Sequence, residues 1–169
     1  MQHNKEITAL LLSEFHRRVF DESFPRIKKC LDELSETEIW KRPNENTASV
    51  GNLVLHLCGN ARQWIISGLS GEKDTRKRSE EFSENGPLKK EFLLRKMDIL
   101  EKDITGVIQK LDKNALEKTY PVQGFNETGV SVIVHVIEHF SYHTGQITLH
   151  TKLLKNIDTG YYKGVQLEG

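Results

Sequence analysis

Three histidines stand at four-residue intervals near the C-terminal end of the sequence: His135, His139 and His143. If this stretch is a helix that turns by about 100° per residue, side chains four positions apart lie one above the other on the same face. Two such neighbours can bind one divalent ion, because neutral imidazole is the commonest metal ligand in proteins. The spacing therefore predicts a metal site on a helix.

The three histidines cannot all bind the same ion. His135 and His143 are about 12 Å apart along the helix axis, whereas the bond from an imidazole nitrogen to zinc is only about 2.0–2.1 Å long. One adjacent pair must therefore combine with a ligand from elsewhere in the chain. The alternative is a set of partly buried histidines bonded to their neighbours, or a solvated stripe. An HxxxH pair beside an apolar helix face favours the metal site.

The sequence offers His56 as the third ligand. Apolar residues recur with helical spacing over residues 50–69, and His56 lies on the flank of that predicted helix. Asn60 and Gln63 follow it on the same side, so that a polar strip runs along an otherwise apolar helix. A lone helical histidine is usually structural, yet this one is the most natural partner for the histidine pair.

Composition restricts the class of protein. The chain has 169 residues, enough for one domain with a substantial core, and we expect a single domain over 1–169. Lys plus Arg equals Asp plus Glu at 24 each, without the basic surface that nucleic acid or an anionic membrane requires. No apolar run approaches the roughly 20 residues that span a bilayer. Two cysteines without a CxxC pair suit a reducing compartment, and we expect a cytoplasmic protein.

The remaining pattern predicts further helices around the site. Helical spacing from Ile7 to Leu34 predicts one long helix, with a kink or short break near Ser23–Pro25 because proline lacks an N–H group. A third main helix is predicted from Leu88 to about Asp112, after Pro87 at its first position. The segment 119–129 is rich in turn formers and leads into the histidine-bearing helix.

Shorter signals lie between these helices. Ser35 and Glu38 form a capping-box signature. Trp40, which follows them, is expected to seal the core rather than to form a ligand shelf. Residues 72–84 read as a solvated connection of mixed charge, with the alternative that Arg76 and Arg78 hold an anionic substrate over the mouth of the bundle. Four apolar-striped helices together predict an all-α four-helix bundle, a fold that builds metal sites from facing side chains.

Two segments resemble the DinB-like superfamily of metal-binding four-helix bundles, in its branch of small bacterial domains of unknown function. They are Ser49-Val-Gly-Asn-Leu-Val-Leu-His56-Leu and His135-Val-Ile-Glu-His139-Phe-Ser-Tyr-His143-Thr-Gly-Gln-Ile147. The resemblance covers essentially the whole chain, and its HxxxHxxxHxGQI motif is much more specific than HxxxH alone. It implies an up-up-down-down bundle, often paired as a homodimer.

The resemblance also implies a ligand set and an activity. A divalent ion would be held by His56, His139 and His143, whereas His135 matches a family histidine that is not usually a ligand. Zinc or nickel is the first expectation, with iron, manganese and copper as alternatives, because availability decides among metals that accept imidazole. Some relatives are thiol S-transferases or thiol-dependent isomerases that use bacillithiol, mycothiol or glutathione.

These observations lead to three hypotheses. The first is a metal-dependent transferase that joins a small-molecule thiol to an electrophile, because three protein ligands leave one coordination position open for a thiolate. Asn60 and Gln146 would then orient the substrate or a water molecule through hydrogen bonds, or simply satisfy buried polar groups. The second is a metal-dependent hydrolase that activates water at the same position. The third is a non-catalytic bundle with a structural metal or a protein-binding surface.

Overall fold

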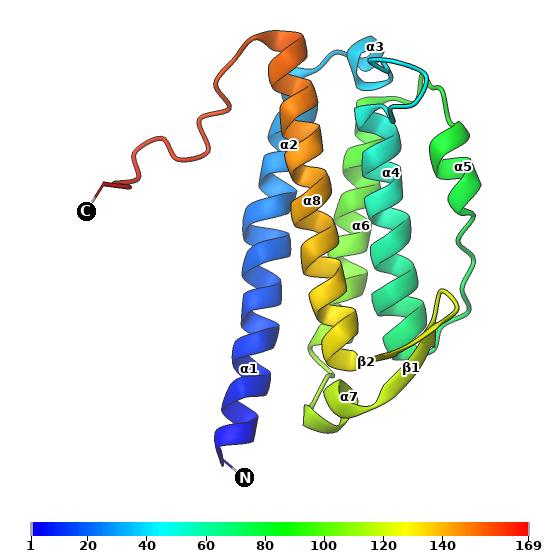
Figure 1. Cartoon of the computed structure of the whole chain (residues 1–169), viewed down its shortest axis with the longest axis vertical. Coiled ribbons are helices and arrows are strands. Elements are labelled where there is room, and N and C mark those ends of the chain that lie inside the picture. Colours follow the sequence, from blue (N-terminus) through cyan, green and yellow to red (C-terminus); the bar gives the residue numbers. More distant parts are fainter. Residues whose placement is uncertain (1, 169) are drawn as a thin grey trace.

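The computed structural model describes residues 2–168, and its helices form a four-helix bundle (Figure 1). The first member joins α1 (Gln2–His16), η1 (Arg17–Ser23) and α2 (Phe24–Glu33). The others are α4 (Val50–Ala61) with its continuation η2 (Arg62–Leu69), α6 (Lys90–Ile108) and α8 (Gly129–Lys155). The all-α bundle predicted from the sequence is confirmed; of the predicted 1–169 domain, Met1 and Gly169 lie outside the described residues.

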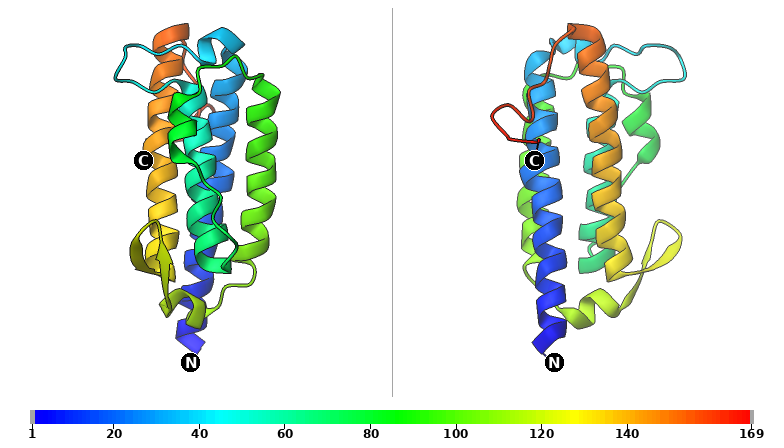
Figure 2. Two further views of the ribbon diagram at one scale, coloured as in Figure 1. Left: turned by 90° about the vertical axis from the view of Figure 1, so that its right-hand side faces the viewer. Right: turned by 60° about the vertical axis from the view of Figure 1, so that its left-hand side comes forward.

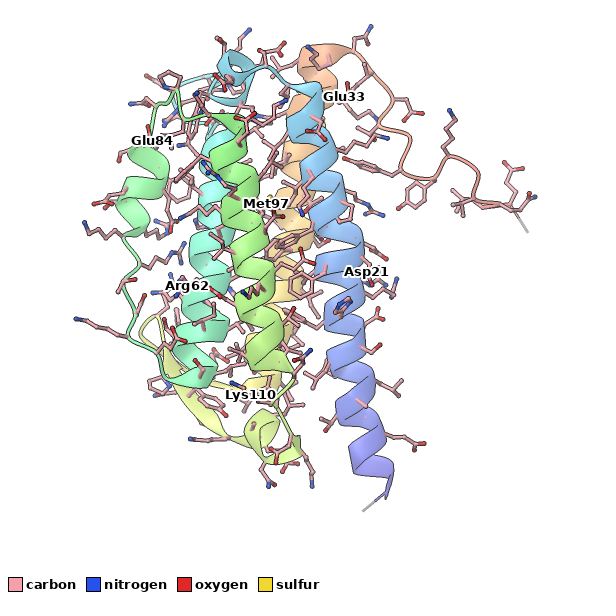
Figure 3. All side chains as sticks on the ribbon, turned by 180° about the vertical axis from the view of Figure 1, so that it is seen from behind. Asp21, Glu33, Arg62, Glu84, Met97 and Lys110 are labelled. Carbon is pink, nitrogen blue, oxygen red and sulfur yellow. The ribbon has the colours of Figure 1, made fainter. Side chains whose placement is uncertain are left out.

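The helix directions differ from the expected up-up-down-down order. The first helix runs up, α4 and α6 both run down, and α8 runs up again (Figure 1). Seen from behind, Glu33 and Glu84 lie near one end of the bundle and Lys110 near the other (Figure 3). The connections explain this up-down-down-up order. Residues 34–49 return the chain at the same end, whereas residues 70–89 run back along the bundle before α6 begins.

No break interrupts the first helix at Pro25. Residues Arg17–Ser23 instead form a π-helical segment, and Pro25 lies in the first turn of α2. The wider π-helical turn accommodates a residue that cannot donate a backbone hydrogen bond. The hydroxyl of Ser23 donates to the carbonyl oxygen of Arg18 at 2.8 Å, so the loosened backbone gains a side-chain partner. The helix therefore stays continuous without the short break that was one predicted alternative, and its irregularity takes the form of the π-helical segment.

Trp40 seals one end of the core, as expected. It follows the short helix α3 (Glu36–Ile39), which opens with the predicted capping box. The Trp40 indole is 9% exposed and donates to the carbonyl oxygen of Leu88 at 3.0 Å. A Cβ atom on Gly51 would lie 2.7 Å from this ring, so the first turn of α4 approaches it as closely as only glycine allows.

The chain between α6 and α8 contains a small hairpin that the sequence did not predict. After α7 (Lys113–Glu117), β1 (Thr119–Val122) pairs antiparallel with β2 (Phe125–Thr128). Gln123 and Gly124 join the strands with positive φ angles of 51° and 83°, as a tight two-residue turn requires. The hairpin lies at the lower end of the bundle, on the side of η2 and α8 (Figure 2).

Apolar side chains from all four helices fill the centre of the bundle. The rings of Phe24 and Phe140 stack with centroids 5.4 Å apart, which joins α2 to α8. Cys30 and Cys58 are buried free thiols, and burial raises the pKa of Cys58 to about 12. Within residues 2–168, no helix combines the length and apolar character needed to cross a membrane.

Candidate metal centre

Three histidines from α4 and α8 converge on one point. One nitrogen from each of His56, His139 and His143 lies within 4.8 Å of the other two. The Nε2 atoms of His56 and His139 are 3.0 Å apart. Among the described residues, no other histidine, cysteine or carboxylate joins this group. The structure therefore brings together the three residues that the resemblance implies, from two helices far apart in sequence.

Hydrogen bonds orient two of the rings. The Nδ1 atom of His56 lies 2.9 Å from a carboxylate oxygen of Glu81, and Nδ1 of His143 lies 2.7 Å from the amide oxygen of Gln146. Because both oxygens accept hydrogen bonds, each ring can donate from Nδ1, although the Arg76 guanidinium also lies 3.0 Å from Nδ1 of His56. A ring with its proton on Nδ1 keeps a free electron pair on Nε2. Gln146 thus contacts a member of the site, one turn beyond it on α8.

The environment keeps the imidazoles of His139 and His143 neutral. Burial, together with the neighbouring imidazoles of His143 and His56, lowers the pKa of His139 to about 3. Burial also lowers the pKa of His143, although its hydrogen bond to Gln146 acts in the opposite direction. Neutral imidazole is the form that binds a metal ion. These two donors therefore fit a divalent ion without first having to lose a proton near neutral pH.

Glu81 is the functional residue that the sequence analysis missed. It lies in α5 (Arg78–Ser83), beside α4, with its side chain only 10% exposed. The Arg76 guanidinium donates two hydrogen bonds to its carboxylate, from Nε to Oε1 at 2.7 Å and from Nη2 to Oε2 at 2.8 Å. Burial alone would raise the pKa of Glu81, but its hydrogen bonds with Arg76 and His56 lower it. An ionised carboxylate behind an imidazole fixes the ring and makes it a stronger ligand.

Most residues of the connection 72–84 are exposed, as predicted, but Arg76 and Glu81 turn inward and tie the connection to α4 as a strap. Gln63 holds it from the helix, because its amide oxygen accepts from Arg76 at 2.8 Å and its amide nitrogen donates to Asp74 at 2.6 Å. Arg76 is 4% exposed and pairs with Glu81 rather than standing free for an anionic substrate. Arg78 lies over the ring of Phe82 instead, at 4.9 Å. Gln63 thus supports the strap and does not reach the three converging nitrogens.

One feature of the sequence does signal the strap. Gly59 lies in the middle of α4, where glycine weakens a helix and usually marks a close approach by another group. A Cβ atom at this position would collide with the carboxylate of Glu81. The glycine indicates that something packs against the helix there, but it does not identify the partner.

His135 lies outside the converging group. Its ring stacks on Trp64 with centroids 3.5 Å apart, and its Nε2 atom lies 3.4 Å from the amide nitrogen of Asn60. Burial lowers its pKa, so this ring is also neutral. His135 and Asn60 form the next polar layer between α4 and α8, one helical turn from His139 and His56.

Comparisons with known proteins agree with this fold. The crystal structure of a DinB-like protein from Bacillus subtilis, YjoA, at 2.30 Å resolution, is similar with a TM-score of 0.63. The similarity covers 86% of this chain and 91% of that chain at 14% sequence identity, and it shows that the chain has a DinB-like fold. A search of curated proteins finds no match. The model of a family described as a protein of unknown function, DUF1572, matches residues 8–162, and the chain therefore belongs to that family.

Proposed function

We propose that the protein binds one divalent ion through His56, His139 and His143 and uses it to transfer a low-molecular-weight thiol to an electrophile. The observation that carries this proposal is the convergence of one nitrogen from each of His56, His139 and His143 on a single point. Two nitrogens that bind one tetrahedral zinc ion lie about 3.3 Å apart. The 3.0 Å between the Nε2 atoms of His56 and His139 is close to that separation.

The number of protein ligands favours catalysis over a purely structural site. Structural zinc sites are usually closed by four protein ligands, whereas catalytic sites have three and keep one position for water or substrate. Three donors converge here among the described residues, and Glu81 is turned to the Nδ1 side of His56. A bound ion would lower the pKa of a coordinated thiol, normally about 8.5, so that it reacts as thiolate near neutral pH.

The protein's own residues would prepare the site for this reaction. The Arg76–Glu81 pair fixes the His56 ring, and Gln146 fixes the His143 ring. In the transfer, the thiolate sulfur forms a bond to the electrophilic carbon while the bond from that carbon to its leaving group breaks, and the thiol proton passes to solvent. Zinc or nickel suits three imidazole ligands, and iron, manganese or copper would also be accepted.

The experiment is a panel of cellular thiols with chlorinated and epoxide electrophiles. It compares zinc- and nickel-loaded protein, chelated protein and His143→Ala, with a parallel panel of esters and amides. A metal-dependent conjugation rate that is lost in the chelated protein and in His143→Ala is the expected result. Metal-dependent cleavage of an ester or amide without conjugation would make the protein a hydrolase, because the same open position activates water. No rate in either panel would leave the metal a stabilising role only.

A further inference from the structure

A second polar layer lies one helical turn from the candidate metal centre. Asn60 follows His56 by one turn on α4, and His135 precedes His139 by one turn on α8. Because α4 and α8 run in opposite directions, these two side chains meet, and the Asn60 amide nitrogen donates to His135 Nε2 at 3.4 Å. The His135 ring is itself held against Trp64, so the amide is fixed from one side.

The other atom of this amide has no partner. Asn60 is 3% exposed, and its Oδ1 atom is buried without a hydrogen bond in the described part of the chain. Buried amide groups are nearly always paired, because losing water without gaining a partner is costly. Asn60 also lies on a helix that is buried almost all round, where leucine or alanine would fill the space at less cost. An unpaired acceptor at this position therefore points to a ligand that completes it.

We propose that Asn60 Oδ1 accepts a hydrogen bond from the thiol substrate, which therefore carries a hydroxyl or amino group near its sulfur. This inference rests on the proposed function. The layers of His56 and Asn60 are separated by about 6 Å, the rise of four residues at about 1.5 Å each. A sulfur and a donor atom joined by two carbon atoms lie about 4 Å apart, and a hydrogen bond of about 3 Å from the donor to Oδ1 covers the rest. The substrate class is thus a β-hydroxy or β-amino thiol, and Asn60 is a specificity-determining residue.

Thr144 provides an internal comparison. Its hydroxyl is also buried and finds no partner among residues 2–168, and the residue is 5% exposed. It lines a hollow between α8 and the first helix, together with Ser23 and Arg26, where none of the three converging histidines is found. Removing this hydroxyl changes a buried unpaired polar group without touching the layer of Asn60, so Thr144→Val is a matched control.

The test uses Co²⁺ as the probe, because its visible absorption reports a coordinated thiolate. Co²⁺-loaded full-length protein is titrated with 2-mercaptoethanol and with 1-propanethiol, which have nearly the same shape but differ in the hydroxyl group. The ratio of the two dissociation constants is compared between variants, so that the intrinsic difference between the thiols cancels. Relative to Asn60→Leu, the unaltered protein should favour 2-mercaptoethanol by about five- to tenfold, the worth of one hydrogen bond. Thr144→Val should keep that preference.

Other outcomes separate this inference from the proposal on which it rests. Asn60→Asp keeps an oxygen acceptor and should retain the preference for 2-mercaptoethanol over 1-propanethiol. If Asn60→Leu fails to fold, loss of this preference in Asn60→Asp would overturn the role of Asn60. An equal ratio in the unaltered protein and Asn60→Leu would overturn the role of Asn60 and leave thiol binding intact. A preference for 2-methoxyethanethiol, which only accepts hydrogen bonds, would overturn the donor class. If Co²⁺ binds but no thiol reaches it, the proposed function itself fails.

Discussion

The two sides of α8 both carry a cluster of polar groups, but the two clusters are built differently. On the side that faces α2, the segment after α8 folds back so that the Tyr161 hydroxyl lies 3.1 Å from the Cys30 sulfur and 2.9 Å from the Thr148 hydroxyl. Each of these groups can both donate and accept, so the cluster is complete within the chain. We refer to these three residues as the tail cluster.

The side that faces α4 gathers three imidazoles that could hold a metal ion. There Nδ1 of His56 faces Glu81 and Nδ1 of His143 faces Gln146. A proton on each Nδ1 would leave the Nε2 electron pairs directed at the space between the rings, an arrangement that a metal ion stabilises. The two sides therefore differ in kind: the groups of the tail cluster bond one another, whereas the histidine nitrogens converge on one point.

The largest expected effect comes from removing the converging imidazoles. His56→Ala, His139→Ala and His143→Ala should each weaken zinc binding by at least about 100-fold, since each removes a direct ligand. His135→Ala should change it by no more than a few-fold, because that ring stacks on Trp64. Competition with a chromogenic chelator and elemental analysis measure both. If His139→Ala kept the metal and His135→Ala lost it, the ligand assignment would be wrong by one helical turn.

The next effect tests the strap. Glu81→Gln should weaken zinc binding by about 10- to 100-fold, the usual cost of removing a carboxylate that orients a ligand histidine. The control is Tyr161→Phe, which removes a partly buried hydroxyl from the tail cluster and should leave zinc affinity unchanged. Equal zinc affinities for Glu81→Gln and the unaltered protein would show that the strap packs against α4 without contributing to metal binding.

Residue spacing predicted part of the site, whereas the choice of His139 and His143 over His135 came from the family resemblance. The four-residue interval places all three histidines on one face, and helical periodicity places His56 on the flank of a second helix. Both inferences depend on local geometry, which a sequence specifies directly. The capping box at Ser35 and the sealing role of Trp40 are local in the same sense, and both are observed.

Features that depend on where a connection lies in space were not predictable. Mixed charge in residues 72–84 is equally compatible with exposure to solvent and with a buried Arg76–Glu81 pair. The neighbouring residues in the sequence do not show which group a charged side chain will pair with. The helix order was wrong for a related reason: it depends on whether residues 70–89 run back along the bundle. The hairpin after α7 has short strands and no marked alternation, so only its turn residues were visible in the sequence.

A smaller effect concerns stability. Chelated protein should remain helical and folded but melt at a lower temperature, because apolar side chains from all four helices form the core and metal bound to the native state adds stability by mass action. The gain is about 2.7 kcal/mol when free metal exceeds its dissociation constant 100-fold. Tyr161→Phe should instead cost about 1 kcal/mol with or without metal. Circular dichroism melts of the unaltered protein and of Tyr161→Phe, each with metal and after chelation, measure these effects. An unfolded chelated protein would indicate a structural metal.

The smallest effect is confined to the tail cluster and appears only at high pH. Burial, reinforced by the contact with Cys30, raises the pKa of Tyr161 from 10.0 to about 12. Between these values the unfolded chain has lost the phenolic proton that the folded chain still holds. The contribution of Tyr161 to the free energy of unfolding is therefore fully present below pH 10 and is lost as pH rises from 10 towards 12. Tyr161→Phe has no such proton, and its unfolding free energy should fall less over this interval. Urea unfolding at pH 9, 10, 11 and 12 measures the difference. Parallel curves for the two proteins would show that solvent reaches the hydroxyl, and the tail cluster would then be no more closed than the histidine side.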